Sequence, residues 1–119
     1  MTTVLGVDGG GRKTYAIVAN ALGELMGAAA SGPSNWELVG IDGARDAIAG
    51  AANAALVEAG IERSALDASV FGLAGVDWPS DLDRLDAVID PIGLSGARRI
   101  VNDSFVALRA GSPSRGAWR

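Results

Sequence analysis

One segment near the amino terminus carries the clearest chemistry in this sequence. Residues 8–14 comprise an aspartate, three consecutive glycines, an arginine, a lysine and a threonine. A glycine run costs conformational entropy on folding, so three in succession indicate a need for bare backbone. The N–H groups of such a turn can approach a phosphate, while the Asp8 carboxylate can hold a divalent metal ion. The alternative interpretation is a glycine-rich hairpin turn without a ligand.

The flanking residues decide which kind of phosphate loop this segment could form. Gly6 and Gly11 have the spacing of a P-loop, but Arg12 intervenes before Lys13. Residues 15–19, Tyr-Ala-Ile-Val-Ala, are rich in β-branched and aromatic side chains, so they predict a strand where a P-loop requires a helix. A dinucleotide-binding glycine fingerprint fails for the same reason. The predicted unit is therefore a strand, an acidic glycine-rich hairpin and a second strand.

A second carboxylate is expected at the same place in the fold. Residues 97–103 are predicted to form a strand that ends at Asp103, and Asp8 ends the first strand. Ligands of open α/β sheets gather at the carboxyl ends of the strands, so both side chains should face one cleft. In phosphoryl transfer, one carboxylate organises Mg²⁺ and another orients or deprotonates the acceptor hydroxyl. Alternatively, Asp103 caps the helix that follows it.

Two further motifs follow predicted strands. Ser34, Asn35 and Trp36 place a hydroxyl and an amide beside an indole ring, which is typical of a sugar site. A turn with a tryptophan that packs on the core is the alternative. Gly75, followed by Asp77, closes another strand at the same edge and permits close approach of the backbone. An ordinary strand-to-helix turn would explain this second motif equally well.

The elements that position these groups follow from hydrophobic periodicity. Three strands within residues 4–30, joined by short turns, predict an antiparallel meander. Strands at residues 68–75 and 97–103 alternate with helices and should pair in parallel. The predicted fold class is α/β, with three antiparallel strands and then alternating helices and parallel strands. Helices are predicted at residues 42–59 and 104–110. A further helix opens at residues 79–81, and its apolar stripe comprises Leu82, Leu85, Val88 and Ile89.

Composition restricts the functions available to the chain. Its 119 residues correspond to one domain, and a net charge of −4 disfavours nucleic acid and anionic membranes as partners. No apolar run is long enough to span a bilayer and the first residues lack a signal-peptide pattern, so a cytoplasmic location is expected. Cysteine and histidine are both absent. Catalysis would therefore depend on carboxylates, lysine, hydroxyls, backbone groups and a metal ion.

Together, the four motifs resemble those of the BadF/BadG/BcrA/BcrD-type ATPases, and within that family they are most similar to the N-acetylglucosamine kinases. The motifs lie at residues 7–14, 32–36, 72–77 and 101–104. The resemblance implies a ribonuclease H-like lobe of the sugar kinase, Hsp70 and actin superfamily. It also implies phosphorylation of an amino-sugar hydroxyl, such as that of N-acetylglucosamine, with ATP as substrate and Mg²⁺ as cofactor.

The resemblance assigns roles by matching position. Asp8 would be the carboxylate on the metal side, and Asp103 the general base. Arg12 stands where the family usually has threonine, and an arginine can also bind phosphate. The phosphate-binding set would be Gly9, Gly10, Gly11, Arg12, Lys13 and Thr14, and the sugar-binding set Ser34, Asn35, Trp36, Gly75, Asp77 and Asn102.

The family continues beyond the matched residues into a second Gly-Thr-Gly loop and an adenosine-binding domain. We therefore expect residues 1–111 to form the amino-terminal actin-like lobe and residues 112–119 an irregular tail. We expect the chain to have little turnover by itself and to pair with a complementary lobe or a second copy. Whether it is an enzyme on its own is left open.

Two other functions stay open. One is an ATPase activator of a CoA-ester dehydratase or reductase, although no cysteine is present for an iron–sulfur cluster and residues 34–36 favour a sugar. The other is a non-catalytic fragment that binds a sugar or a partner.

Overall fold

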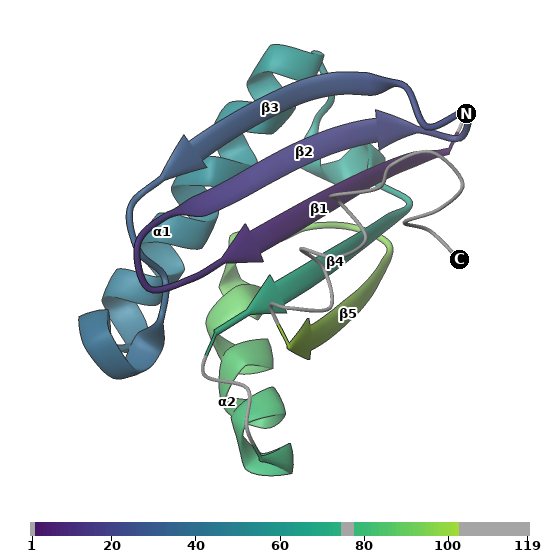
Figure 1. Ribbon diagram of the computed structural model, residues 1–119. Helices are drawn as coiled ribbons and strands as arrows, with labels where there is room; N and C mark the ends of the chain where they lie inside the picture. Colours follow the sequence, from purple (N-terminus) through teal and green to yellow (C-terminus); the bar gives the residue numbers. More distant parts are fainter. Residues whose placement is uncertain (1, 75–77, 103–119) are drawn as a thin grey trace.

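A five-stranded mixed sheet, with both helices packed on one face, forms the part of the chain that the computed structural model describes, residues 2–74 and 78–102 (Figure 1). The strand order is β3-β2-β1-β4-β5; β1, β2 and β3 pair antiparallel, and β1, β4 and β5 pair in parallel. This confirms the predicted α/β class. The elements are β1 (Thr3–Gly9), β2 (Thr14–Asn20), β3 (Leu25–Ser31), α1 (Trp36–Ala59), η1 (Arg63–Ala65), β4 (Ala68–Leu73), α2 (Pro79–Ile89), η2 (Asp90–Ile92) and β5 (Ala97–Asn102).

The core lies between the sheet and the two helices. Alternate residues of β1, and of the first part of β2, are buried, as the period of a half-buried strand requires. The alanine-rich face of α1 packs closely on β3: a Cβ atom on Gly27 would overlap the carbonyl oxygen of Ala55. The largest buried side chains in this layer are Leu5, Val7, Val18, Ile48, Phe71, Leu73, Leu85, Val88 and Ile89.

Helix α1 begins earlier than its periodicity predicted. We expected it to start near residue 42, whereas Asn35 is the N-cap and Trp36 the first helical residue. The helix is interrupted at Gly40, whose φ of 79° and ψ of 172° are not helical. The apolar spacing that predicted a helix from residue 42 therefore describes only the part after Gly40. The preceding turn is defined by its cap, since the Asn35 side chain accepts a hydrogen bond from Glu37 N.

Helix α2 begins at Pro79, as predicted, but one member of its predicted apolar stripe was wrong. Leu82 is 39% exposed, whereas Asp81 is 6% exposed. Asp81 is buried because it has two local partners: its carboxylate accepts a hydrogen bond from Trp78 N at 2.9 Å and binds Arg84 Nη1 at 3.2 Å. The capping function of Asp81 thus overrides the apolar pattern at this turn.

Several expectations lie outside the described residues, namely the helix at residues 104–110 and the tail at residues 112–119. In residues 2–74 and 78–102, no helix is long and apolar enough to cross a membrane.

Candidate functional site

The carboxyl ends of the three parallel strands meet at one edge of the sheet. Gly9, Leu73 and Asn102 occupy the same register level of β1, β4 and β5. Ala74 N donates a hydrogen bond to the Gly9 carbonyl oxygen at 2.8 Å, which joins the end of β4 to the end of β1. This edge is where the sequence predicted a ligand cleft. Three of the predicted site residues, Gly75, Asp77 and Asp103, follow these strand ends but lie outside the described residues.

The hairpin between β1 and β2 has the predicted form. Gly9 pairs with Thr14, and Gly10 N donates to the Lys13 carbonyl oxygen at 3.0 Å, so residues 10–13 form the turn. Asp8, which we expected to end the first strand, is its penultimate residue and pairs with Tyr15 of β2. The turn therefore projects from the sheet edge at which the parallel strands end (Figure 1).

The three consecutive glycines, Gly9 at the end of β1 and Gly10 and Gly11 in the turn, differ in what the fold requires of them. None has a positive φ, so left-handed backbone does not explain the run. A Cβ atom on Gly9 would overlap Ser34 Oγ and lie 2.9 Å from Leu73 Cδ2. A Cβ atom on Gly10 or Gly11 would meet nothing closer than 3.8 and 3.5 Å, respectively. Packing thus requires glycine only at position 9, and the other two leave bare backbone that the fold itself does not need.

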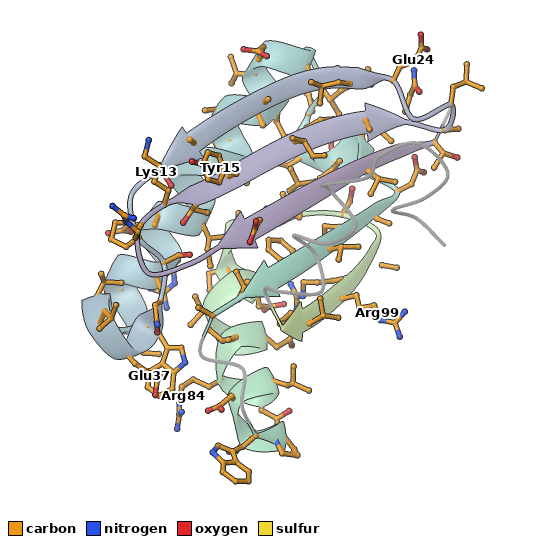
Figure 2. All side chains as sticks on the ribbon, in the orientation of Figure 1. Lys13, Tyr15, Glu24, Glu37, Arg84 and Arg99 are labelled. Carbon is orange, nitrogen blue, oxygen red and sulfur yellow. The ribbon has the colours of Figure 1, made fainter. Side chains whose placement is uncertain are left out.

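An open depression of about 660 Å³ lies beside the turn. Arg12 and Lys13 are exposed there, and Tyr15 is 52% exposed; Figure 2 shows Lys13 and Tyr15 at this end of the β1–β2 hairpin. The depression is lined by Asp8, Gly10, Gly11, Arg12, Lys13 and Tyr15. Tyr15 was not among the predicted site residues. Hairpin register could have identified it, because a four-residue turn that pairs Gly9 with Thr14 also pairs Asp8 with Tyr15.

Thr14 connects the hairpin to the next motif. It is fully buried, and its hydroxyl donates a hydrogen bond to the Gly32 carbonyl oxygen at 2.8 Å. Ser34 N donates to the Gly10 carbonyl oxygen at 3.0 Å. The structure therefore joins the glycine turn and the segment of residues 32–36 directly. Two motifs that are separate in sequence form one connected surface at the sheet edge.

Ser34, one of the predicted sugar-binding residues, has a buried polar atom. The residue is 1% exposed, and its Oγ has no hydrogen-bond partner among the described residues. A buried hydroxyl without a partner costs about 1–3 kcal/mol. Such a group in a native fold calls for an explanation, and an ordered water molecule or a ligand atom would each supply one.

Asn35 and Trp36 are positioned by the start of α1. Asn35 Oδ1 accepts the capping hydrogen bond from Glu37 N at 3.0 Å, so its NH₂ group points away from the cap. Trp36 is half-buried, and the guanidinium carbon of Arg84 lies 4.4 Å from the centroid of its ring. Arg84 was not predicted as a site residue. It lies on α2, far from Trp36 in sequence, and no local pattern links the two.

No curated protein sequence matches this chain. Among solved structures, a candidate N-acetylglucosamine kinase from Chromobacterium violaceum has a TM-score of 0.65 at 20% identity, covering 93% of this chain and 39% of that one. A candidate N-acetylglucosamine kinase from Porphyromonas gingivalis has a TM-score of 0.65 at 19% identity, covering 94% and 36%. YeaZ from Pseudomonas aeruginosa has a TM-score of 0.62 at 18% identity, covering 98% and 51%.

These likenesses show the fold, which is that of actin-like ATPases and sugar kinases. The chain spans 36–51% of the length of these three structures. The family model of the BadF/BadG/BcrA/BcrD ATPases matches residues 5–111, which include all four motifs. The chain therefore belongs to the BadF/BadG/BcrA/BcrD ATPase family.

Proposed function

We propose that this chain supplies the phosphate- and sugar-binding side of an ATP-dependent amino-sugar kinase. The reaction would transfer the terminal phosphoryl group of ATP to a hydroxyl of a sugar such as N-acetylglucosamine. The observation that carries the proposal is the turn at residues 10–13: bare backbone that the fold does not require lies beside two exposed cations and the Asp8 carboxylate.

The turn suits the phosphates of ATP for two reasons. The backbone N–H groups of Gly11 and Arg12 make no hydrogen bond within the described residues, so both can donate to phosphate oxygens. The Arg12 and Lys13 side chains add positive charge in a chain whose net charge is −4. Hydrogen bonds from charged donors to phosphate are about twice as strong as neutral ones. Thr14 supports the turn through its bond to Gly32.

Among the described residues that line the depression, Asp8 supplies the carboxylate. Within residues 2–74 and 78–102, no group of three or more acidic or imidazole side chains could hold a metal ion by itself. This donor set fits Mg²⁺, which proteins commonly bind through one or two carboxylates while substrate phosphates supply further ligands. When bound, Mg²⁺ would offset the negative charge of the phosphates.

The sugar would lie against residues 34–36. Ser34 Oγ lacks a partner, and the Asn35 NH₂ group makes no hydrogen bond within the described residues, so both can bind sugar hydroxyls. The Trp36 ring can pack against the apolar face of a pyranose. Because Ser34 N is bonded to the Gly10 carbonyl oxygen, these groups and the phosphate turn would hold the two substrates at one edge.

In this proposal, Asp103 accepts the proton of the sugar hydroxyl as the hydroxyl oxygen attacks the terminal phosphorus and ADP leaves. Asn102, at the end of β5, precedes Asp103 and would bind the sugar together with Gly75 and Asp77. The alignment of Gly9, Leu73 and Asn102 supports this arrangement, because it brings the ends of β1, β4 and β5 together.

The phosphate part of the proposal is tested by Gly11→Ala. The new Cβ atom has room in the fold, since its nearest neighbour is Leu38 Cδ1 at 3.5 Å, but it would cover backbone that approaches the phosphates. Calorimetric titration should show that the unaltered chain binds Mg-ATP and that Gly11→Ala weakens this binding at least about tenfold, or 1.4 kcal/mol. Gly50→Ala on α1, where the nearest atom is 3.9 Å away, is the matched control and should bind normally. Failure of the unaltered chain to bind Mg-ATP would refute the proposal.

The sugar part is tested by Ser34→Ala. Removing the unpartnered hydroxyl should leave the free energy of unfolding unchanged or raise it by about 1 kcal/mol. The same change should weaken N-acetylglucosamine binding several-fold, because the sugar loses a hydrogen-bond partner. Thermal unfolding and sugar titration measure the two effects. A variant with lower stability and unchanged sugar affinity would show that Ser34 serves the fold alone.

A further inference from the structure

The first turn of α1 is not continuous with the rest of the helix. Gly40 has φ and ψ values of 79° and 172°, which break the helical path after Val39. The turn before the break begins with Trp36 and is capped by Asn35. The helix body therefore does not by itself fix the orientation of this turn. Its position depends on the elements that contact it from either side.

The hairpin supports one side of the turn and α2 the other. Ser34 N is bonded to the Gly10 carbonyl oxygen, which fixes the chain where it enters the turn. On the other side, the guanidinium of Arg84 stacks over the Trp36 ring, with Cζ 4.4 Å from the centroid. This distance is within the range of a cation–π contact. Figure 2 labels Arg84 and Glu37, which mark where the first turn of α1 meets α2.

Arg84 is itself held in place. Its Nη1 lies 3.2 Å from Asp81 Oδ1, and the Asp81 side chain is 8% exposed. The other carboxylate oxygen of Asp81 accepts a hydrogen bond from Trp78 N at 2.9 Å, so the carboxylate is fixed to the start of α2. The Asp81 carboxylate is buried and has two polar partners, so it orients the Arg84 guanidinium. The planar guanidinium in turn covers one face of the Trp36 indole.

We infer that Arg84 is a positioning residue for sugar recognition. Through Asp81 it holds one face of the Trp36 indole, which also packs against the core, and so fixes where the ring meets the sugar. The inference rests on the proposed function, because it assigns Trp36 to the sugar. Arg84 is not among the residues that line the depression at the glycine turn. Its loss should therefore change sugar affinity and leave Mg-ATP affinity unaltered.

The test compares Arg84→Gln, Arg84→Lys and Arg98→Gln in the full 119-residue chain. Arg98 is the matched control, since it also forms ion pairs with carboxylates near α2. Its Nη2 atom lies 2.8 Å from Asp86, within α2, and 3.3 Å from Asp90, which follows α2. N-acetylglucosamine and Mg-ATP are titrated separately. Arg84→Gln should weaken sugar binding roughly five- to tenfold, as expected for a lost cation–π contact and a less ordered ring. Arg84→Lys should restore part of the loss, and Arg98→Gln should match the unaltered chain.

The fluorescence of Trp36 gives a second readout that does not require sugar. Replacing Trp78 and Trp118 by phenylalanine leaves Trp36 as the single tryptophan. In that background Arg84→Gln should shift the emission to longer wavelength, because the uncovered ring face becomes hydrated. If the unaltered chain binds sugar and Arg84→Gln changes neither affinity nor emission, the inference is wrong while the proposed function stands. If the unaltered chain binds no sugar, the proposed sugar role fails, and an unchanged emission would then also overturn the Arg84 contact.

Discussion

Gly9→Ala is expected to lower the free energy of unfolding by about 2–3 kcal/mol, the upper part of the range for overpacked cores. The Cβ atom would overlap Ser34 Oγ and lie 2.9 Å from Leu73 Cδ2, and both neighbours are fully buried. Neither can move away cheaply, because the Ser34 backbone is bonded to Gly10 and Leu73 is fully buried on β4, between β1 and β5. For a domain of this size the melting temperature should fall by about 10 °C or more.

Thermal unfolding followed by circular dichroism measures this effect, and Gly11→Ala is its matched control. Gly11 lies in the same turn and also lacks a positive φ, but a Cβ atom there has room. Its melting temperature should stay within about 2 °C of the unaltered chain, as expected for a surface change. If Gly9→Ala and Gly11→Ala lower the melting temperature equally, the claim that packing requires glycine at position 9 but not at position 11 is wrong.

Arg12→Glu is expected to weaken Mg-ATP binding by at least about tenfold, since a hydrogen bond to a charged group contributes about 1.5–3 kcal/mol. The change replaces a cation beside the proposed phosphate site with an anion, so repulsion adds to the lost bond. Titration at two salt concentrations should show the difference shrinking at higher salt, because Arg12 is exposed and its charge is screened.

Arg99→Glu is the control for net charge. Arg99 is exposed on β5, away from the hairpin, and its replacement changes the net charge by the same amount (Figure 2). If both variants weaken Mg-ATP binding equally, the effect of Arg12 is one of overall charge and the proposed phosphate contact is wrong. This comparison also tests whether Arg12 binds phosphate at the position where the family usually has threonine.

The sheet was predictable because its strands follow simple patterns. Alternation in β1 and β2, the short connections of the meander and the alternation of helices with later strands indicate the observed antiparallel and parallel pairing. The glycine turn was predictable in place, but not the unequal roles of its glycines. Those roles depend on Ser34 and Leu73, which reach Gly9 from segments distant in sequence.

The contacts that sequence could not predict are those between elements. The stacking of Arg84 on Trp36 depends on where α2 lies relative to α1. The burial of Asp81, in contrast, follows from a local capping bond that the apolar periodicity of α2 does not reveal. Tyr15 lines the depression because the hairpin register pairs it with Asp8, and residue type alone does not reveal this pairing. Side-chain chemistry thus indicated which motifs are candidates for a site, while the three-dimensional packing determined which of the described residues lie beside them.

The central claim is that the β1–β2 turn binds the phosphates of a nucleotide. The most direct measurement is the backbone amide spectrum of the ¹⁵N-labelled chain during titration with Mg-ATP. Binding at the turn predicts saturable shifts concentrated at the amides of Gly10, Gly11, Arg12 and Lys13, and their loss or strong weakening in Gly11→Ala. Unchanged amide resonances at these four positions at saturating Mg-ATP would contradict the claim.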